Sequence, residues 1–354
     1  MLDLETLFKQ AAEANASDIY LISGRPLSYK VDGEITPMTE ERLMPEDTQS
    51  LIEEIYRMSS NRSISRVSEK GDDDFSFSIP GIARFRVSAY KQRGTLAAVI
   101  RVVAFDLPDP STLGIPEVVL KQADKKKGLV LVTGPAGSGK STTLSCIINQ
   151  INNNRNAHII TLEDPIEFLH RHNQSIVSQR EISLDTSSYV VALRAALRQA
   201  PDVILLGELR DSETINIAMT AAETGHLVIS TLHTVGAANT IDRIIDAFPA
   251  NQQGQIRVQL AMVLQSVISQ QLVPNTQGHV TPAFEIMIVN DAIRNMIRES
   301  KIHQIDSVIT SSQAEGMVTM DTNLLKMYKE GHITDLTALA FATQPELMKR
   351  KMAL

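Results

Sequence analysis

One short segment of this sequence carries a strong chemical signal. Residues 134–141 read Gly-Pro-Ala-Gly-Ser-Gly-Lys-Ser and match the phosphate-loop pattern GxxxxGK[ST], between an apolar run and an amphipathic stretch. Glycines let successive backbone N–H groups turn toward a phosphate, and the N-terminus of the following helix adds positive potential. Lys140 can reach the β- and γ-phosphates, and the Ser141 hydroxyl can ligate Mg²⁺. We therefore expect ATP and Mg²⁺ to be bound by Gly134, Pro135, Ala136, Gly137, Ser138, Gly139, Lys140, Ser141 and Thr142.

Two acidic residues follow apolar runs and are candidates for the hydrolysis step. Glu163 follows HIITL, and Glu208 follows VILLG. In the second segment, phosphate-loop enzymes commonly have an aspartate where this chain has the Gly-Glu pair. Ligands of open parallel sheets lie at the carboxyl ends of the strands. We assign Glu163 as the base that activates water and Glu208 as a support for Mg²⁺ and its waters. The two roles can be exchanged, and either acid alone can instead cap a helix.

Two histidines flank the apolar run 227–231. An extended strand between them keeps His226 and His233 too far apart to share a metal ion. We expect His226 to reach the γ-phosphate side as a sensor, with a hydrogen-bonded structural role as the alternative. His233, at the far end of the strand, is assigned to a subunit boundary.

A strand in the first hundred residues presents arginines on one face. In ARFRVSAY, Arg84 and Arg86 alternate with apolar residues, and Arg93 lies in the turn beyond. A solvated strand face explains this pattern. However, many phosphate-loop enzymes complete their site with an arginine from elsewhere. Arg84 and Arg93 are therefore candidate catalytic arginines, acting on the ATP of the same or a neighbouring subunit.

These residues require two domains to position them. Residues 2–14 and 46–58 show helical spacing, and strands are predicted around them in residues 1–104. Residues 105–116 contain three prolines and a glycine and are predicted to form a linker. From residue 117 onward we predict an α/β domain, because the apolar runs 129–133, 158–162, 203–206 and 227–231 alternate with amphipathic helices. After about residue 250 the chain is predicted to be mostly helical.

Composition narrows the class of protein. The chain has 354 residues, a net charge of −7 and one cysteine, Cys146. A single cysteine builds neither an internal disulfide nor a multi-cysteine zinc site. The net negative charge disfavours a general nucleic-acid-binding protein. The sequence shows neither a secretory signal nor an apolar run of membrane-spanning length, so we expect a cytoplasmic protein.

Taken together, these motifs resemble the type IV pilus retraction ATPases, the PilT family of the secretion ATPase superfamily. GPAGSGKSTT is similar to its Walker A motif, ITLEDPIE to its aspartate box and PDVILLGELRD to its Walker B motif. TAAETGHLVISTLHT resembles its histidine box, and RFRVSAYKQRG resembles the arginine-bearing segment of its N-terminal domain. The segment AIRNMIRE, residues 292–299, closely resembles a C-terminal signature linked to retraction.

The resemblance implies a hexameric ring with a PAS-like N-terminal domain and a RecA-like C-terminal ATPase domain. Arginines such as Arg84 and Arg93 would approach the phosphates, and the ring would act on an inner-membrane platform protein from the cytoplasmic side. Alternatives are an assembly or type II secretion ATPase, an accessory motor beside another pilus ATPase, or a nucleotide-gated regulator with little turnover. A nucleic-acid translocase is disfavoured because the sequence lacks a basic, aromatic stacking surface.

Overall fold

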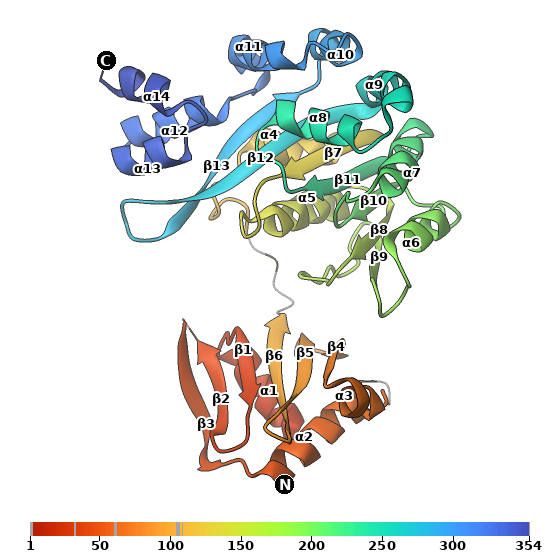
Figure 1. Ribbon diagram of the computed structural model, residues 1–354, viewed down its shortest axis with the longest axis vertical. Coiled ribbons are helices and arrows are strands. Elements are labelled where there is room, and N and C mark those ends of the chain that lie inside the picture. Colours follow the sequence, from red (N-terminus) through yellow and green to blue (C-terminus); the bar gives the residue numbers. More distant parts are fainter. Residues whose placement is uncertain (1–2, 32, 60–61, 104–106, 108, 354) are drawn as a thin grey trace. The chain divides into compact units, whose positions relative to one another are not determined.

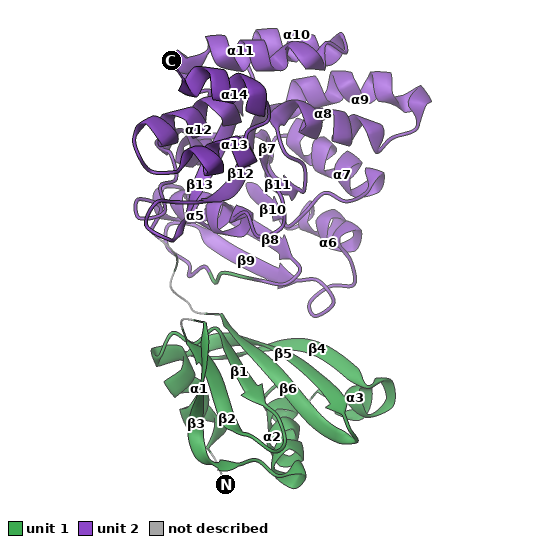
Figure 2. Ribbon diagram, turned by 60° about the vertical axis from the view of Figure 1, so that its left-hand side comes forward, with its two compact units in different colours: residues 1–107, 167–169 green, residues 108–166, 170–354 purple. Residues whose placement is uncertain are grey.

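A computed structural model describes residues 3–31, 33–59, 62–103, 107 and 109–353. It divides into two compact units, residues 1–107 with 167–169, and residues 108–166 with 170–354 (Figure 2). The first unit contains one hydrophobic cluster of buried residues and the second contains three, so each unit is described separately. Positions 105, 106 and 108 of the expected linker lie outside the described residues.

The first unit is an antiparallel sheet packed against helices. Its strand order is β3-β2-β1-β6-β5-β4. The strands are β1 (Asp18–Leu21), β2 (Pro26–Val31), β3 (Glu34–Arg42), β4 (Asp72–Ile79), β5 (Ala83–Gln92) and β6 (Thr95–Val103). The helices are α1 (Leu4–Glu13), α2 (Pro45–Met58) and α3 (Ser65–Lys70). The two longer helices and the strands confirm the sequence prediction, whereas α3 was not predicted.

Alternation along β5 determines which of its faces is buried. Phe85, Val87 and Ala89 are fully buried, while Arg84 and Arg86 on the other face are partly exposed. The Phe85 ring lies 4.5 Å from the ring of Phe8 on α1. Successive residues of a strand point to opposite faces, so packing against α1 turns the arginines away from the core.

The second unit is an α/β fold around a seven-stranded sheet, with helices on both faces (Figure 1). The strand order is β13-β12-β7-β11-β10-β8-β9, and only β13 runs antiparallel to its neighbour. The strands are β7 (Gly128–Thr133), β8 (His158–Glu163), β9 (Ile176–Glu181), β10 (Val203–Leu206), β11 (Leu227–Leu232), β12 (Leu264–Pro274) and β13 (Val280–Ile288). This RecA-like arrangement matches the predicted fold class.

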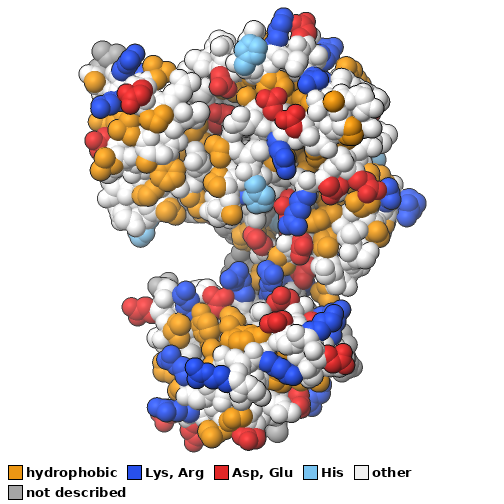
Figure 3. Space-filling view, in the orientation of Figure 1, with side chains coloured by type: hydrophobic (Ala, Val, Ile, Leu, Met, Phe, Trp, Pro, Cys, Tyr) orange, Lys and Arg blue, Asp and Glu red, His pale blue; other side chains and the backbone are white. Residues whose placement is uncertain are grey.

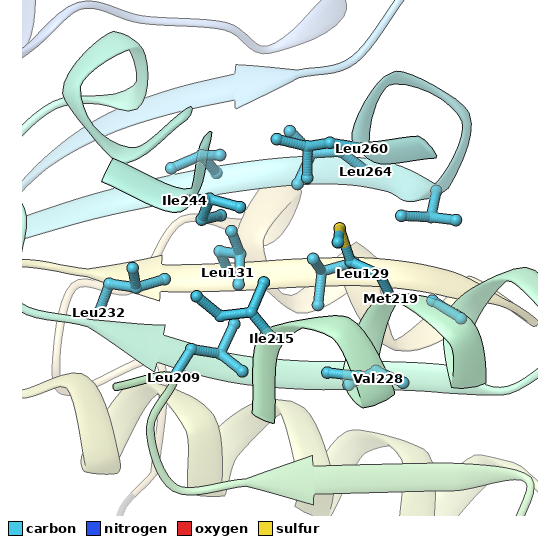
Figure 4. Close-up of a cluster of buried hydrophobic side chains, with 14 of the residues drawn as sticks. Leu129, Leu131, Leu209, Ile215, Met219, Val228, Leu232, Ile244, Leu260 and Leu264 are labelled. Atoms are coloured by element: carbon cyan, nitrogen blue, oxygen red, sulfur yellow. The ribbon is translucent and has the colours of Figure 1, made fainter. Parts of the chain in front are cut away.

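Both faces of the central strands are buried, which explains their continuous apolar sequences. On β7, Leu129 and Leu131 pack into the cluster under α6 to α9, shown in Figure 4. Val130 and Val132 point to the opposite face, which α5 covers.

The helices of this unit are α4 (Glu117–Leu120), α5 (Lys140–Asn154), α6 (Tyr189–Ala196), α7 (Ser212–Glu223), α8 (Ala237–Asp246), α9 (Ala250–Val263), α10 (Asp291–Arg298), α11 (Ile305–Ser311), α12 (Met320–Lys329), α13 (Asp335–Phe341) and α14 (Pro345–Met352).

The prediction of a mostly helical chain after residue 250 is wrong for the hairpin β12–β13. This hairpin pairs with β7 and extends the sheet. The sequence did not predict the strand β12, because its buried positions include the polar residues Ser266, Ser269 and Gln270. Each is hydrogen-bonded: Ser266 to Gln122, Ser269 to the Gly236 N–H, and Gln270 to Thr143. Among the helices of the described chain, none is long and apolar enough to span a membrane.

Candidate active site

The phosphate loop joins the carboxyl end of β7 to the first residue of α5. The backbone at Gly134 has a φ of 143°, and a Cβ there would lie 2.1 Å from the Gln270 carbonyl oxygen and 2.7 Å from Ser138 Oγ. Only glycine fits this close approach. The loop therefore wraps tightly around the N-terminus of α5, where free backbone N–H groups attract anions.

The side chains of the loop fit the phosphates of a nucleotide. Lys140 Nζ donates to the carbonyl oxygens of Gly134 (2.9 Å) and Pro135 (2.8 Å), which holds the ammonium group on the loop. Ser138 Oγ is buried and makes no hydrogen bond to another described residue. A buried hydroxyl without a partner is costly, and a phosphate oxygen is a suitable acceptor for it. Ser141 follows Lys140 at the start of α5 and supplies an oxygen of the kind that Mg²⁺ prefers.

Gln270 supports the loop from β12 and was not predicted as a site residue. Its side-chain Oε1 accepts a hydrogen bond from Thr143 Oγ1 at 2.7 Å, which ties β12 to the first turn of α5. Its Nε2 lies 2.9 Å from the place of a Cβ on Gly139. No motif indicated this residue, because the strand that carries it was itself not predicted.

The parallel strands bring both candidate acids to the edge of the sheet where the loop lies. β7, β11, β10 and β8 are consecutive neighbours and run in the same direction. Glu208 follows β10, two strand spacings or about 10 Å from the loop, and Glu163 ends β8, about 14 Å away. Glu208 is thus the nearer acid.

The side chains of Arg210 and His233 hold Glu208. Its Oε1 is paired with Arg210, and its Oε2 lies 3.4 Å from Nε2 of His233. Burial raises the pKa of Glu208, but Arg210 and His233 outweigh this effect and the net pKa is lowered. The carboxylate is therefore charged at neutral pH. It faces a cavity of about 300 Å³ lined by Glu208, Leu209, Arg210, Leu232, His233, Thr234 and Arg243.

Hydrogen bonds from Thr161 and Gln179 orient Glu163. Its Oε1 accepts hydrogen bonds from Thr161 Oγ1 at 2.6 Å and from Gln179 Nε2 at 3.3 Å. Gln179 Oε1 in turn accepts from the backbone N–H of His170 at 2.7 Å. These contacts restrict the rotamers of the carboxylate. Arg210, Arg243 and Gln179 were not predicted as site residues.

The expectation for His226 is wrong within this chain. β11 runs parallel to β7, and His226 precedes its first residue, so it lies at the sheet edge opposite the phosphate loop. Its carbonyl accepts from the Gly128 N–H at 3.0 Å, and its Nδ1 lies 2.9 Å from the Ala221 carbonyl oxygen. These hydrogen bonds are the kind that the alternative, a structural role for His226, predicts. His233, assigned from sequence to a subunit boundary, is the histidine beside Glu208.

The two candidate arginines lie at opposite ends of β5. Arg84 is its second residue, and Arg93 follows its last residue. Nine residues of extended strand separate them by about 30 Å. Arg84 pairs with Val103 at the end of β6, and Arg93 lies in the β5–β6 turn. One copy of the unit cannot bring both arginines to the same phosphate group, and their roles remain predictions.

This fold and site define a phosphate-loop nucleoside triphosphatase of the RecA-like kind. The sequence matches the type II/IV secretion system protein family over residues 2–306. It is 44% identical to the type IV pilus retraction ATPase PilT of Pseudomonas aeruginosa, over 98% of this chain and 99% of that protein. It is 39% identical to the type IV pilus ATPase PilU of the same organism, over 96% of this chain and 89% of that protein.

A solved structure extends the likeness to three dimensions. The crystal structure of the pilus retraction motor PilT with bound ADP superimposes with a TM-score of 0.90 and 46% identity, covering 99% of this chain and all of that chain. The chain therefore belongs to the type II/IV secretion ATPases and, within them, to the PilT family of pilus retraction ATPases. It is an ATPase.

Proposed function

We propose that this chain is the ATP-driven motor of type IV pilus retraction and works as a hexameric ring. The proposal rests on one observation above all: Glu208 is held as a charged carboxylate at the same sheet edge as the Lys140 loop. This arrangement suits phosphoryl transfer to water. The likeness to a retraction motor over nearly the whole chain supports the choice of pilus retraction.

Different residues of one site have different roles in ATP hydrolysis. Backbone N–H groups of the loop and Lys140 bind the phosphates, and Thr142 completes the loop at the start of α5. Ser141 and Glu208 would hold Mg²⁺, which when bound neutralises charge on the phosphates. Glu163 accepts the proton of the attacking water, and its contacts to Thr161 and Gln179 keep it oriented for this role.

The arginines of the first unit would complete the site across a domain or subunit boundary. In this proposal residues 1–104 form a PAS-like domain, 105–116 the linker and 117–354 the ATPase domain. Arg84 or Arg93 would stabilise the charge that develops on the transferred phosphoryl group, an effect of about 10³–10⁵ in rate for arginines of this kind.

The preference for retraction over assembly depends on α10, which carries most of the AIRNMIRE segment. Ile293 and Ile297 are fully buried, and Arg294 donates to the carbonyl oxygens of Ala261 (2.6 Å) and Met262 (3.2 Å). These contacts fix α10 against the C-terminus of α9. Asn295 and Arg298 face solvent and are available to a partner.

The partner we propose is the inner-membrane platform protein of the pilus, contacted from the cytoplasmic side. Nucleic acid is not proposed as a partner. On the face shown in Figure 3, Lys and Arg side chains are interspersed with Asp and Glu rather than forming a continuous basic surface. A continuous basic surface is the usual feature of nucleic-acid binding.

Pilus dynamics test this function directly. A strain without the gene should keep its surface pili, which should fail to shorten, and it should not move by twitching. A wild-type copy should restore both activities, and a Lys140→Ala copy should restore neither. Loss of surface pili in the deletion strain would instead identify an assembly motor. Persisting but weakened retraction would identify an accessory motor beside another pilus ATPase.

A further inference from the structure

The cavity beside Glu208 is lined by basic side chains that the mechanism above does not use. Its lining brings together Arg210 from the loop after β10, His233 from the residue after β11 and Arg243 from α8. Among its described lining residues Glu208 is the single acid, so two arginines face one carboxylate. The lining therefore has a net positive charge even when His233 is neutral.

Arg243 has no anionic partner within the described chain. Arg210 pairs with Glu208, whereas Arg243 makes no hydrogen bond or ion pair with another residue that the structure describes. The guanidinium group of an arginine presents five N–H donors in a planar fork, which suits the oxygens of a phosphate. Arg243 therefore has donors available for a ligand that enters the cavity.

The cavity adjoins the phosphate loop. Leu232, a part of its wall, accepts a hydrogen bond on its carbonyl oxygen from the Gly134 N–H at 3.3 Å. Leu209 and Leu232, the apolar part of the wall, belong to the buried cluster shown in Figure 4. The cavity volume of about 300 Å³ is that of roughly ten water molecules, which leaves room for a phosphate ion with some of its water. An anion released at the loop therefore has this cavity beside it.

We infer that the cavity binds the orthophosphate that hydrolysis releases, with Arg243 as its main binding residue. The inference rests on the proposed function: a water oxygen joins the γ-phosphorus, the bond from that phosphorus to the ADP oxygen breaks, and Glu163 takes the proton. The side chain of Arg210 is 67% exposed and can turn from Glu208 to the phosphate at low cost. Two guanidinium groups then hold the product beside the loop while ADP is still bound.

Phosphate binding to the ADP complex tests the inference without turnover. Full-length protein saturated with Mg²⁺ and ADP, so that the nucleotide fills the loop, is titrated with inorganic phosphate in a calorimeter at constant ionic strength. We expect one phosphate per bound ADP. Arg243→Ala should weaken this binding at least about tenfold, as for lost hydrogen bonds to a charged group. Arg350→Ala, at an exposed position on α14, is the control and should bind phosphate like wild type.

Product inhibition provides a second measurement. Added phosphate should inhibit ATP hydrolysis by the wild type, and Arg243→Ala should need at least about tenfold more phosphate for the same inhibition. The affinity for ADP should be the same in both proteins, because the inference places Arg243 outside the loop. A weaker affinity for ADP in Arg243→Ala would assign the arginine to the nucleotide and overturn the inference.

A carboxylate from a second copy of this chain is the other anion that the cavity suits. In that case Arg243→Ala would dissociate the oligomer in size-exclusion chromatography and leave phosphate binding unchanged. Unchanged phosphate binding in Arg243→Ala, or no phosphate binding to the ADP complex of the wild type, would overturn the inference. A wild-type protein without Lys140-dependent hydrolysis would instead overturn the proposed function. The calorimetric titration needs no turnover, so it decides in either event whether the cavity binds phosphate.

Discussion

Glu208 has two partners that differ in how firmly they hold it. The side chain of Arg210 is 67% exposed, whereas that of Glu208 is 14% exposed. Water screens the charge of an exposed arginine, so such a pair contributes little to stability. The carboxylate can therefore exchange Arg210 for another partner at low cost when a nucleotide binds. His233 lies on the other oxygen and can keep the side chain oriented during that exchange.

Replacing this carboxylate by its amide should separate binding from turnover. Glu208→Gln keeps the size of the side chain but loses its charge and its basicity. We expect ATP affinity within about threefold of wild type and a kcat lower by about 10²–10³. Equilibrium binding of a fluorescent ATP analogue and steady-state phosphate release measure the two quantities.

Glu330→Gln, an exposed change at the C-terminal end of α12, is the control for this experiment. It should alter neither quantity. Phosphate release by Glu208→Gln at the wild-type rate would remove Glu208 from the mechanism and leave Glu163 as the acid of the site.

At the level of elements, a buried carboxylate joins two helices to the edge of the sheet. Glu285 on β13 is only 6% exposed. Its Oε1 accepts from the N–H of Ala237 at 2.7 Å, and its Oε2 accepts from the N–H of Met320 at 3.2 Å. These residues begin α8 and α12, so one side chain caps both helices. Because α8 follows the loop after His233, this contact also steadies one wall of the site.

Removing this shared cap should destabilise the ATPase unit strongly. Glu285→Ala leaves two buried N–H groups without partners, and we expect a loss of about 2–4 kcal/mol in the free energy of unfolding. Urea denaturation followed by circular dichroism measures this value. Glu330→Ala, at an exposed position, should cost less than about 0.5 kcal/mol. Equal stabilities of the two variants would contradict the capping role.

The same carboxylate should make stability depend on pH. Burial raises the pKa of Glu285, and the Ala237 and Met320 amides oppose this effect only partly. An unfolded glutamate loses its proton near pH 4.3, whereas folded Glu285 keeps it to a higher pH. Above about pH 4.3 the folded state therefore holds more protons, and stability falls as the pH rises. Glu285→Gln lacks this titration, so wild type should lose stability relative to it between pH 4 and 7. The opposite slope would contradict the assignment.

Local patterns predicted those elements whose burial follows a simple period. The amphipathic stretch after the phosphate loop predicted α5, and its apolar residues Leu144, Ile147, Ile148 and Ile151 are all buried. The strands that were missed, β9 and β12–β13, contain polar residues whose partners lie far away in sequence. Gln270, for example, bonds to Thr143, 127 positions earlier. No local pattern contains such a pairing.

The residues of the candidate site were likewise predictable only where a local sequence pattern marks them. The loop and both acids follow from their position after apolar strands. Arg243 and Gln270 could not be found, because their positions beside Glu208 and Gly134 depend on how the elements pack. The role of His226 was misassigned because the direction of β11 relative to the loop decides which of its two flanking histidines is at the site.

For the whole molecule, the open question is which subunit supplies an arginine to each ATP. If Arg84 or Arg93 acts across a subunit boundary, a subunit without Lys140 can still complete the site of its neighbour. Mixing Lys140→Ala protein with Arg84→Ala, or separately with Arg93→Ala, should then restore phosphate release that neither protein shows alone. Because about 30 Å separate the two arginines, we expect one mixture to recover more than the other. Absence of recovery in both would exclude a role across subunits.

The central claim is that an assembled form of this chain hydrolyses ATP at the Gly134–Ser141 loop. Phosphate release from purified full-length protein, measured across size-exclusion fractions in Mg²⁺ and ATP, tests it most directly. We predict that activity coincides with a closed oligomer and falls at least about a hundredfold in Lys140→Ala, which loses the cation on the β- and γ-phosphates. Activity that is the same in wild type and Lys140→Ala, or no activity in any oligomer, would contradict the account.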